Sequence, residues 1–353
     1  MTTTADAPVR SGATTHVPAG GLRERRLLVL LALLGLVAAA ALASVAVGTR
    51  SLSPGEVWRA LFDSDPTSEA AIIVQQLRVP RTVLGLMVGA ALGMSGALMQ
   101  GHTRNPLGDP GLLDVTAGAS LAVVLGIAYL DVTSASGYVW FAFAGALSGT
   151  VLVYAIGSSG RGGATPITLA LAGAALSALL YALVRAIVVT DTQTLDAFRF
   201  WQVGALAGRG PEVAWQVAPF IALGALLALA NAPALNLLGM GEDVARGLGQ
   251  RIWLARAVGL VAITLLCGAA TAACGPIAFV GLVVPHVVRA FTGPDQRWLV
   301  PCSALAGAAL LLTADVLGRV LARPGELQVG IVLALVGAPF FIALVRRRRT
   351  TAL

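Results

Sequence analysis

Few side chains in this 353-residue sequence combine the residue types and spacing that chemistry at a site needs. His102 and His286 stand on separate segments without a cysteine or carboxylate at ligand spacing, so we expect no metal site. Cys267, Cys274 and Cys302 lie in apolar stretches without a Cys-x-x-Cys spacing, which is typical of small core residues. A Walker A phosphate-binding loop needs a lysine, and all 24 basic residues are arginine. The sequence therefore predicts no metal, no cofactor, no nucleotide site and no enzyme active site.

One carboxylate could take part in proton chemistry. Asp315 lies near the end of an apolar segment, and Arg319 follows one helical turn later. A proton relay is one interpretation of such a residue, because ionisable groups inside membrane segments often serve proton transfer. A local ion pair is the interpretation that we favour. Arg185 lies five residues inside an expected span, whereas Arg256 and Arg289 fall within three residues of a span end and count with the inner arginines.

Two polar segments indicate contact with other parts of a larger assembly. The turn Arg104, Asn105, Pro106, Leu107, Gly108, Asp109, Pro110 contains two prolines, which predict a rigid re-entry into the following helix. We expect this segment to be a cytoplasmic turn or gate. Residues 236–250 predict a short, stiff helix, since Glu242 and Asp243 suit the first turn of a helix and Gly247 and Gly249 would end it. A stiff helix between two membrane spans suits docking onto another protein.

The remaining pattern concerns packing. Gly85, Gly89 and Gly93 recur every fourth residue, followed by Gly96. Glycines at this spacing share one helix face and allow the backbone of a neighbouring helix to approach closely.

The elements that carry these residues are membrane helices. Hydrophobic residues make up 57% of the chain and charged residues only 12%, and the mean hydropathy is +0.84. A soluble domain carries about 25% charged residues. The basic residues gather at segment ends, which indicates topology signals and anionic lipid contact rather than nucleic-acid binding. We place ten spans, at about 27–48, 82–101, 112–130, 138–157, 166–190, 213–232, 253–273, 277–290, 299–318 and 327–345.

The arginines also predict the orientation. With a cytoplasmic N-terminus, 15 arginines fall inside and 8 outside, as expected for an inner-membrane protein with both termini in the cytoplasm. We expect residues 1–26 to form a disordered cytoplasmic tail, 27–345 the membrane domain, and 346–353 a basic cytoplasmic tail. The external stretches 50–81 and 190–212 mix charged and amphipathic residues such as Trp58 and Trp201, and predict short interfacial helices.

A weak internal repeat accompanies these spans. Gly89-Ala90-Ala91 with Gly96 matches Gly268-Ala269-Ala270 with Gly275 at the same spacing. The second and seventh spans run in opposite directions, as in the inverted repeats of transporters.

Several of these motifs together resemble the permease family of iron-siderophore, haem and cobalamin ABC importers. The matching stretches keep the family's order and run from about residue 55 to the C-terminus. They include Arg78-Val79-Pro80-Arg81, the glycine-rich run from Gly89 to Gln100, Arg104-Asn105-Pro106-Leu107, Gly275 to Leu282, Pro285-His286, and Gly337-Ala338-Pro339-Phe340. The sequence departs from the family at Gly108, where alanine is usual, and at Gln328, where proline is common, so we expect a less kinked start to the last span.

The resemblance implies a ten-span, all-α permease of the type II ABC importer fold. It implies a second permease subunit, two cytoplasmic ATP-binding subunits and an extracytoplasmic binding protein. The coupling helix that meets the ATPase would include Gly239, Glu242, Asp243, Ala245, Leu248 and Gly249, and Arg78, Arg81 and Arg319 would dock the binding protein. The fifth span would line the pathway.

A ferric siderophore is the substrate that this resemblance favours, with cobalamin or haem as alternatives. Two other classes of function remain to be weighed. An ion-coupled secondary transporter would place ionisable residues deep in several spans, and a membrane enzyme would need a convergent set of reactive side chains. The sequence shows neither pattern.

Overall fold

The computed structural model describes residues 19–62, 68–132, 134–160 and 165–350, and in this part of the chain every regular element is a helix. In chain order the elements are α1 (Ala19–Ala46), α2 (Pro54–Phe62), α3 (Glu69–Ala71), η1 (Ile72–Arg78), α4 (Val79–Thr103), η2 (Pro110–Leu113), α5 (Val115–Leu130), α6 (Ala135–Ser158), α7 (Pro166–Thr190), α8 (Thr192–Gln202), α9 (Pro211–Gly239), α10 (Glu242–Gly247), α11 (Ile252–Cys274), α12 (Val280–Thr292), α13 (Gln296–Leu321) and α14 (Val329–Thr350).

Ten of these helical segments correspond to the ten expected spans. Seven are long and apolar enough to cross a membrane, and three shorter apolar helices lie at 115–130, 280–292 and 329–343. Several spans are longer than expected, and the second and sixth are examples. The second begins at Glu69, because α3, η1 and α4 form one continuous helix, and the sixth extends to Gly239. The eighth is short, as expected, and holds Pro285 inside α12.

The glycine face of α4 explains how the centre of the bundle packs. A Cβ atom on Gly89 would lie within 3.0 Å of the backbone of Gly307, one on Gly93 within 3.0 Å of Ser303, and one on Gly96 within 3.0 Å of Gly281. The first two contacts join α4 to α13 and the third joins it to α12. Gly85 instead meets the side chain of Leu312. Close backbone approach of this kind holds helices together where lipid supplies no hydrophobic drive between them.

The two halves of the weak repeat meet in the same core. α4 packs against α11, as well as against α9 and α13. The repeat differs at its last glycine, however. Gly96 lies in the middle of α4, whereas Gly275 has a φ of +76° and ends α11.

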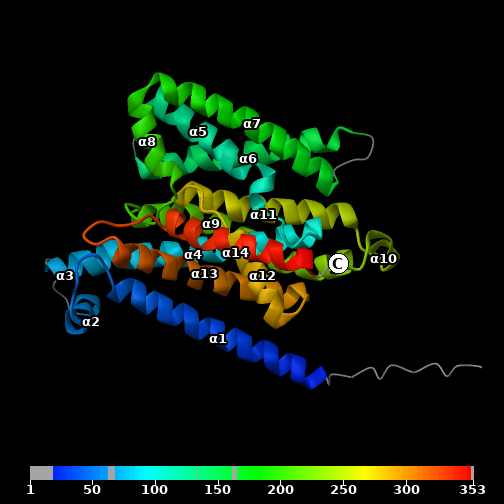
Figure 1. The fold of residues 1–353 in the computed structure, drawn as a ribbon, viewed down its shortest axis with the longest axis horizontal. Helices are drawn as coiled ribbons and strands as arrows, with labels where there is room; N and C mark the ends of the chain where they lie inside the picture. Colours follow the sequence, from blue (N-terminus) through cyan, green and yellow to red (C-terminus); the bar gives the residue numbers. More distant parts are fainter. Residues whose placement is uncertain (1–18, 63–67, 133, 161–164, 351–353) are drawn as a thin grey trace, which may run out of the picture.

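The short helices occupy opposite ends of the bundle (Figure 1). The helices α2, α3 and α8 lie at one end, and α10 lies at the other, where α1 also begins and α14 ends. We call these the outer and inner ends. Residues 19–26, expected in a disordered tail, are the first turns of α1, and residues 346–350 belong to α14. Residues 1–18 and 351–353 of the expected tails lie outside the described residues.

The two short helices expected at the outer end are present, and α8 differs from the expectation in what it contacts. Phe198 and Trp201 are buried against the bundle rather than placed at an interface with lipid. Asp191 caps α8, since its carboxylate accepts hydrogen bonds from the hydroxyl of Thr194 and from the N–H groups of Gln193 and Thr194. These bonds lower the pKa of Asp191 below its ordinary value. In 50–81, only α2 forms a separate helix, because residues from Glu69 onward extend the second span.

Candidate functional site

Asp315 anchors a charge cluster at the outer end. Its side chain is 0% exposed, and one carboxylate oxygen accepts a hydrogen bond of 2.8 Å from Arg319 on the same helix. Arg81 on α4 donates to Asp315 through Nε and NH2 at distances down to 2.8 Å, and its NH1 reaches Glu326 at 2.8 Å. The local ion pair expected between Asp315 and Arg319 is confirmed, and Arg81 joins it from 234 positions away in the chain.

The guanidinium groups nearby also cap α1. Arg78 donates to the carbonyl oxygens of Val45 and Ala46, at 3.0 and 2.7 Å. Arg319 donates to the carbonyl oxygen of Ser44 at 2.8 Å, and Arg323 to that of Gly48 at 2.7 Å. The last carbonyls of a helix have no partner within it and carry partial negative charge, so cationic donors are favourable there.

The predicted docking arginines are largely buried. Arg78 is 5% exposed and Arg319 is 2% exposed, and both use their donors inside the chain. The side chain of Arg81 is 12% exposed and is paired with two carboxylates. They lie together at the end of the bundle that carries α2, α3 and α8, but they do not present free charges on its surface. The reason is that α1 ends beside them with unsatisfied carbonyls, a long-range contact that motif spacing cannot reveal.

A cavity of about 620 Å³ opens beside this cluster. Besides the three arginines already named, its lining includes Arg50, Arg209 and Glu326. Arg50 forms an exposed ion pair with Glu69, and Arg209 is paired with no carboxylate in the described part of the chain. The cavity therefore carries a net positive charge. Sequence reasoning missed Arg50 and Arg209 as members of this site, although both counted among the outer arginines.

At the inner end, Glu242 joins three segments. Its Oε1 accepts hydrogen bonds from Arg256 at the start of α11 and from Arg104 at the end of α4, the latter at 3.1 Å. Arg246 lies 3.7 Å from Oε2 on the same short helix. Glu242 thus turns toward the bundle and fixes α10 against two membrane helices. Asp243, its neighbour, has a side chain that is 99% exposed.

The helix α10 is shorter than the segment 236–250 predicted for it, because residues 236–239 belong to α9. Gly241 and Gly249 have φ values of +112° and +81°, which a residue with a Cβ rarely adopts. Ala245 is the buried residue of α10, whereas Met240, Val244 and Leu248 are exposed. Three exposed apolar side chains beside an exposed carboxylate form a face suited to a protein partner.

The proline-rich turn is locked by its own side chains. Arg104 ends α4 with a φ of +50°. Asn105 Oδ1 accepts a hydrogen bond of 3.0 Å from the N–H of Leu107, and Asp109 Oδ1 accepts one of 2.7 Å from the N–H of Gly111. Pro110 packs against Gly281 at the start of α12. The turn thereby couples the inner end of α4 to the eighth span.

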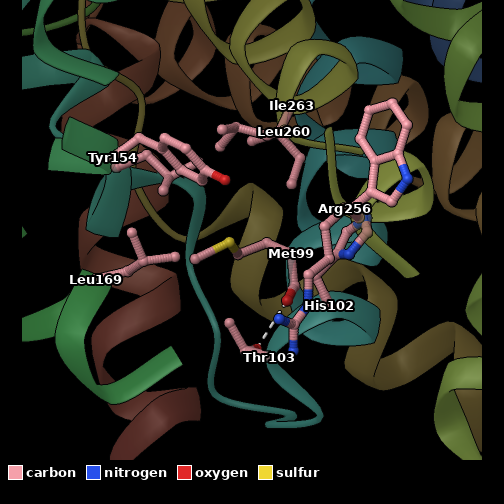
Figure 2. A pocket seen from close by; sticks show the side chains of 10 residues that line it. Met99, His102, Thr103, Tyr154, Leu169, Arg256, Leu260 and Ile263 are labelled. Carbon is pink, nitrogen blue, oxygen red and sulfur yellow. Dashed lines mark hydrogen bonds between the residues drawn. The ribbon is translucent and has the colours of Figure 1, made fainter. Parts of the chain in front are cut away.

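A cavity of about 180 Å³ lies next to this turn, between α4, α6, α7 and α11 (Figure 2). Its walls are mainly apolar, with Met99, Tyr154 and Leu260 around His102. His102 Nε2 lies 3.1 Å from Nδ2 of Asn231, so this ring already has a partner within the protein. In the described part of the chain no three His, Cys, Asp or Glu side chains gather to hold a metal ion.

A bundle of apolar helices with polar elements confined to its two ends defines a multi-pass integral membrane protein. A model of the FecCD transport family matches residues 36–347. The chain belongs to this family, and the resemblance drawn from its motifs is confirmed.

Individual relatives agree with this result. The ferric enterobactin transport system permease protein FepD of Escherichia coli is 47% identical, over 90% of this chain and 94% of the relative. The hemin transport system permease protein HmuU of Yersinia pestis is 38% identical, over 90% and 95%. A solved structure described as a metal-chelate type ABC transporter in an inward-facing conformation matches with a TM-score of 0.79 and 29% identity, covering 91% of this chain and 99% of that one. The expected all-α permease fold is confirmed.

Proposed function

We propose that this chain is the permease subunit of a binding-protein-dependent ABC importer that carries a ferric siderophore across the inner membrane by ATP-driven alternating access. One observation carries the proposal: the 47% identity to the ferric enterobactin permease FepD over 90% of the chain. Haem is the second candidate substrate, favoured by the 38% identity to HmuU, and cobalamin is a third. In this assignment both termini and α10 are cytoplasmic.

The inner end supports coupling to ATP-binding subunits. Met240, Val244 and Leu248 form an exposed apolar face beside Asp243, and Glu242 ties this face to α4 and α11 through Arg104 and Arg256. A displacement of α10 would therefore be transmitted directly to α4 and α11. The sequence has no lysine for a Walker A loop. We infer that two partner subunits hydrolyse ATP and that Gly241 and Gly249 give α10 its fixed angle.

The outer end supports docking of a binding protein. Arg50 and Arg209 line the positive cavity together with Arg81, and acidic side chains of a partner would find complementary charge there. Arg78 and Arg319 contribute by holding the end of α1 at the cavity wall. We infer that docking uses this cavity as a whole, rather than three free surface arginines.

A second permease subunit would cover the faces that this chain leaves open. Leu171, Leu179 and Leu183 on α7, and Leu335 and Val336 on α14, are exposed. Apolar faces on the fifth and tenth spans suit the wall of a shared pathway, across which a bulky chelate can slide without tight binding. The partner is either a second copy or a homologous chain.

Uptake by intact cells tests this proposal. Cells lacking the chain are supplied with a radioiron-labelled ferric tris-catecholate, with labelled haem or with labelled cobalamin. We expect loss of ferric siderophore uptake, restored by the intact chain and not by a Val244→Asp variant, which places a charge on the α10 docking face. An Arg59→Gln variant, changed on exposed α2, should restore uptake fully. Loss of only haem or cobalamin uptake would reassign the substrate, and no loss at all would refute an import role.

A further inference from the structure

A cavity of about 420 Å³ lies between α7 and α8 toward the outer end, apart from the 620 Å³ cavity that Arg50 and Arg209 line. Tyr181 and Arg185 line it from one face of α7, and Arg199 and Gln202 line it from one face of α8. Its volume falls within the range of about 300–1,000 Å³ that is usual for small-molecule sites. Each of these four side chains carries hydrogen-bond donors, and two of them are permanent cations.

The two positive charges in this cavity are only partly compensated. No carboxylate lines it. Within the described residues Arg185 has neither a hydrogen bond nor an ion pair. Arg199 pairs at 3.3 Å with Asp196 on its own helix, but both side chains are more than half exposed. Arg199 also lies 5.2 Å from the ring of Phe200. The excess positive charge of the cavity therefore comes from Arg185.

The side chain of Arg185 lies inside a membrane span, where exposure of its charge to lipid would be unfavourable. It lies five residues before the end of α7, or about 7.5 Å along the helix axis at 1.5 Å per residue. A charged side chain inside a membrane span is costly unless it meets water, a partner or a ligand. Arg185 lines the cavity with α8 opposite, so water or a ligand can reach it there.

We propose that the cavity between α7 and α8 binds an anionic ferric chelate at the outer end of the pathway, with Arg185 and Arg199 as its ligands. The inference rests on the proposed import function and deepens it, because it assigns a charge to the substrate. Three catecholate dianions around Fe³⁺ give a complex of net charge −3, whose outer oxygens accept hydrogen bonds. Guanidinium groups suit such oxygens because they present several donors in a fixed plane. Three hydroxamate monoanions around Fe³⁺ give a neutral complex, which is the matched control ligand.

Equilibrium binding tests this site. The full-length chain, with the subunits that copurify with it, is placed in phosphatidylcholine nanodiscs without binding protein. Dialysis against a radioiron-labelled ferric tris-catecholate then gives the Kd. We expect an Arg185→Gln/Arg199→Gln variant to bind on the order of tenfold more weakly, which corresponds to about 1.4 kcal/mol. An Arg185→Lys/Arg199→Lys variant keeps both charges but loses the planar donor set, so its Kd should lie between those of the original chain and the glutamine variant.

Two controls separate charge recognition from general effects. Arg59→Gln removes an outer-end arginine on α2 and should leave the Kd unchanged. Binding of a neutral ferric tris-hydroxamate should not respond to the glutamine double variant. Thermal unfolding midpoints are compared for all variants, and the single Arg185→Gln variant, changed at an exposed side chain, replaces the double variant if the latter is less stable.

Three results would overturn the assignment. The first is an unchanged Kd in the glutamine variant, and the second is no measurable binding to the original chain. The third is that phosphatidylglycerol added to the nanodiscs binds the original chain but not the glutamine variant and displaces the chelate, since the cavity then holds an anionic lipid headgroup. Siderophore uptake that depends on the chain, together with an unchanged Kd, would refute this cavity alone. Uptake that does not depend on the chain would refute the import function.

Discussion

The buried carboxylate of Asp315 compensates the positive charges of two guanidinium groups. Its carboxylate is 0% exposed and accepts hydrogen bonds from Arg81 on α4 and from Arg319 on α13. Arg319 in turn holds the last turn of α1 through the carbonyl oxygen of Ser44. The carboxylate therefore connects three helices, and its charge makes the burial of two guanidinium groups tolerable.

Neutralising this carboxylate should destabilise the protein strongly. Breaking a buried ion pair by removing one partner costs about 3–5 kcal/mol, because the other charge stays buried and unpaired. We expect Asp315→Asn to lower the thermal unfolding midpoint in detergent markedly. Asp196→Asn, which removes a carboxylate from an exposed pair on α8, should change it little. Equal midpoints for the two variants would show that the buried cluster contributes nothing.

The sequence predicts only part of such contacts. Arg319 follows Asp315 at i+4, so their pairing is visible in the spacing. Arg81 is 234 positions away, and only the packing of α4 against α13 brings it there. The contacts of Glu242 were also only partly predictable. Its place in the first turn of a helix follows from the sequence, whereas its hydrogen bonds to Arg104 and Arg256 depend on the tertiary fold.

At the scale of elements, the glycine face of α4 sets how closely the central helices approach. We expect Gly93→Ala to lower the unfolding midpoint, because its Cβ would meet the backbone carbonyl of Ser303, which cannot rotate away. Overpacking of a tight core costs typically about 1–3 kcal/mol. Gly35→Ala on α1, where a Cβ meets nothing within 4 Å, should be neutral or slightly stabilising. If Gly93→Ala behaves like Gly35→Ala, α4 and α13 do not pack as closely as described.

Element boundaries were predictable where hydrophobicity ends sharply and not elsewhere. The fifth span, expected at 166–190, is α7 from Pro166 to Thr190, because a proline and a capping threonine begin it and Asp191 follows it. The second span continues outward to Glu69 through residues as polar as Gln75 and Gln76. There α-helical and π-helical turns join without a break, and tertiary contacts decide the length.

For the whole molecule, composition and arginine placement predict the class of fold, since they depend on the membrane rather than on particular contacts. What they do not predict is which face of each span is covered. The face of α7 with Leu171 and Leu179 is exposed, while Leu176 and Leu180 on the same helix are buried, and all four are the same residue type. Only the three-dimensional arrangement distinguishes them.

The orientation of the whole bundle follows from its two ends and can be measured directly. The arginine distribution predicts that α10 faces the cytoplasm and α2 faces outward. The three native cysteines are buried, so single cysteines introduced as Asp243→Cys and Arg59→Cys should supply the label-reactive thiols. We expect a membrane-impermeant maleimide to modify Arg59→Cys in right-side-out vesicles and Asp243→Cys only in inside-out vesicles, with the unsubstituted chain unlabelled in both. Because α1 begins and α14 ends beside α10 (Figure 1), this result would also assign both termini to the cytoplasm. The reverse labelling would invert the bundle and would place the α10 docking face on the side of the membrane where no ATP-hydrolysing subunit could reach it.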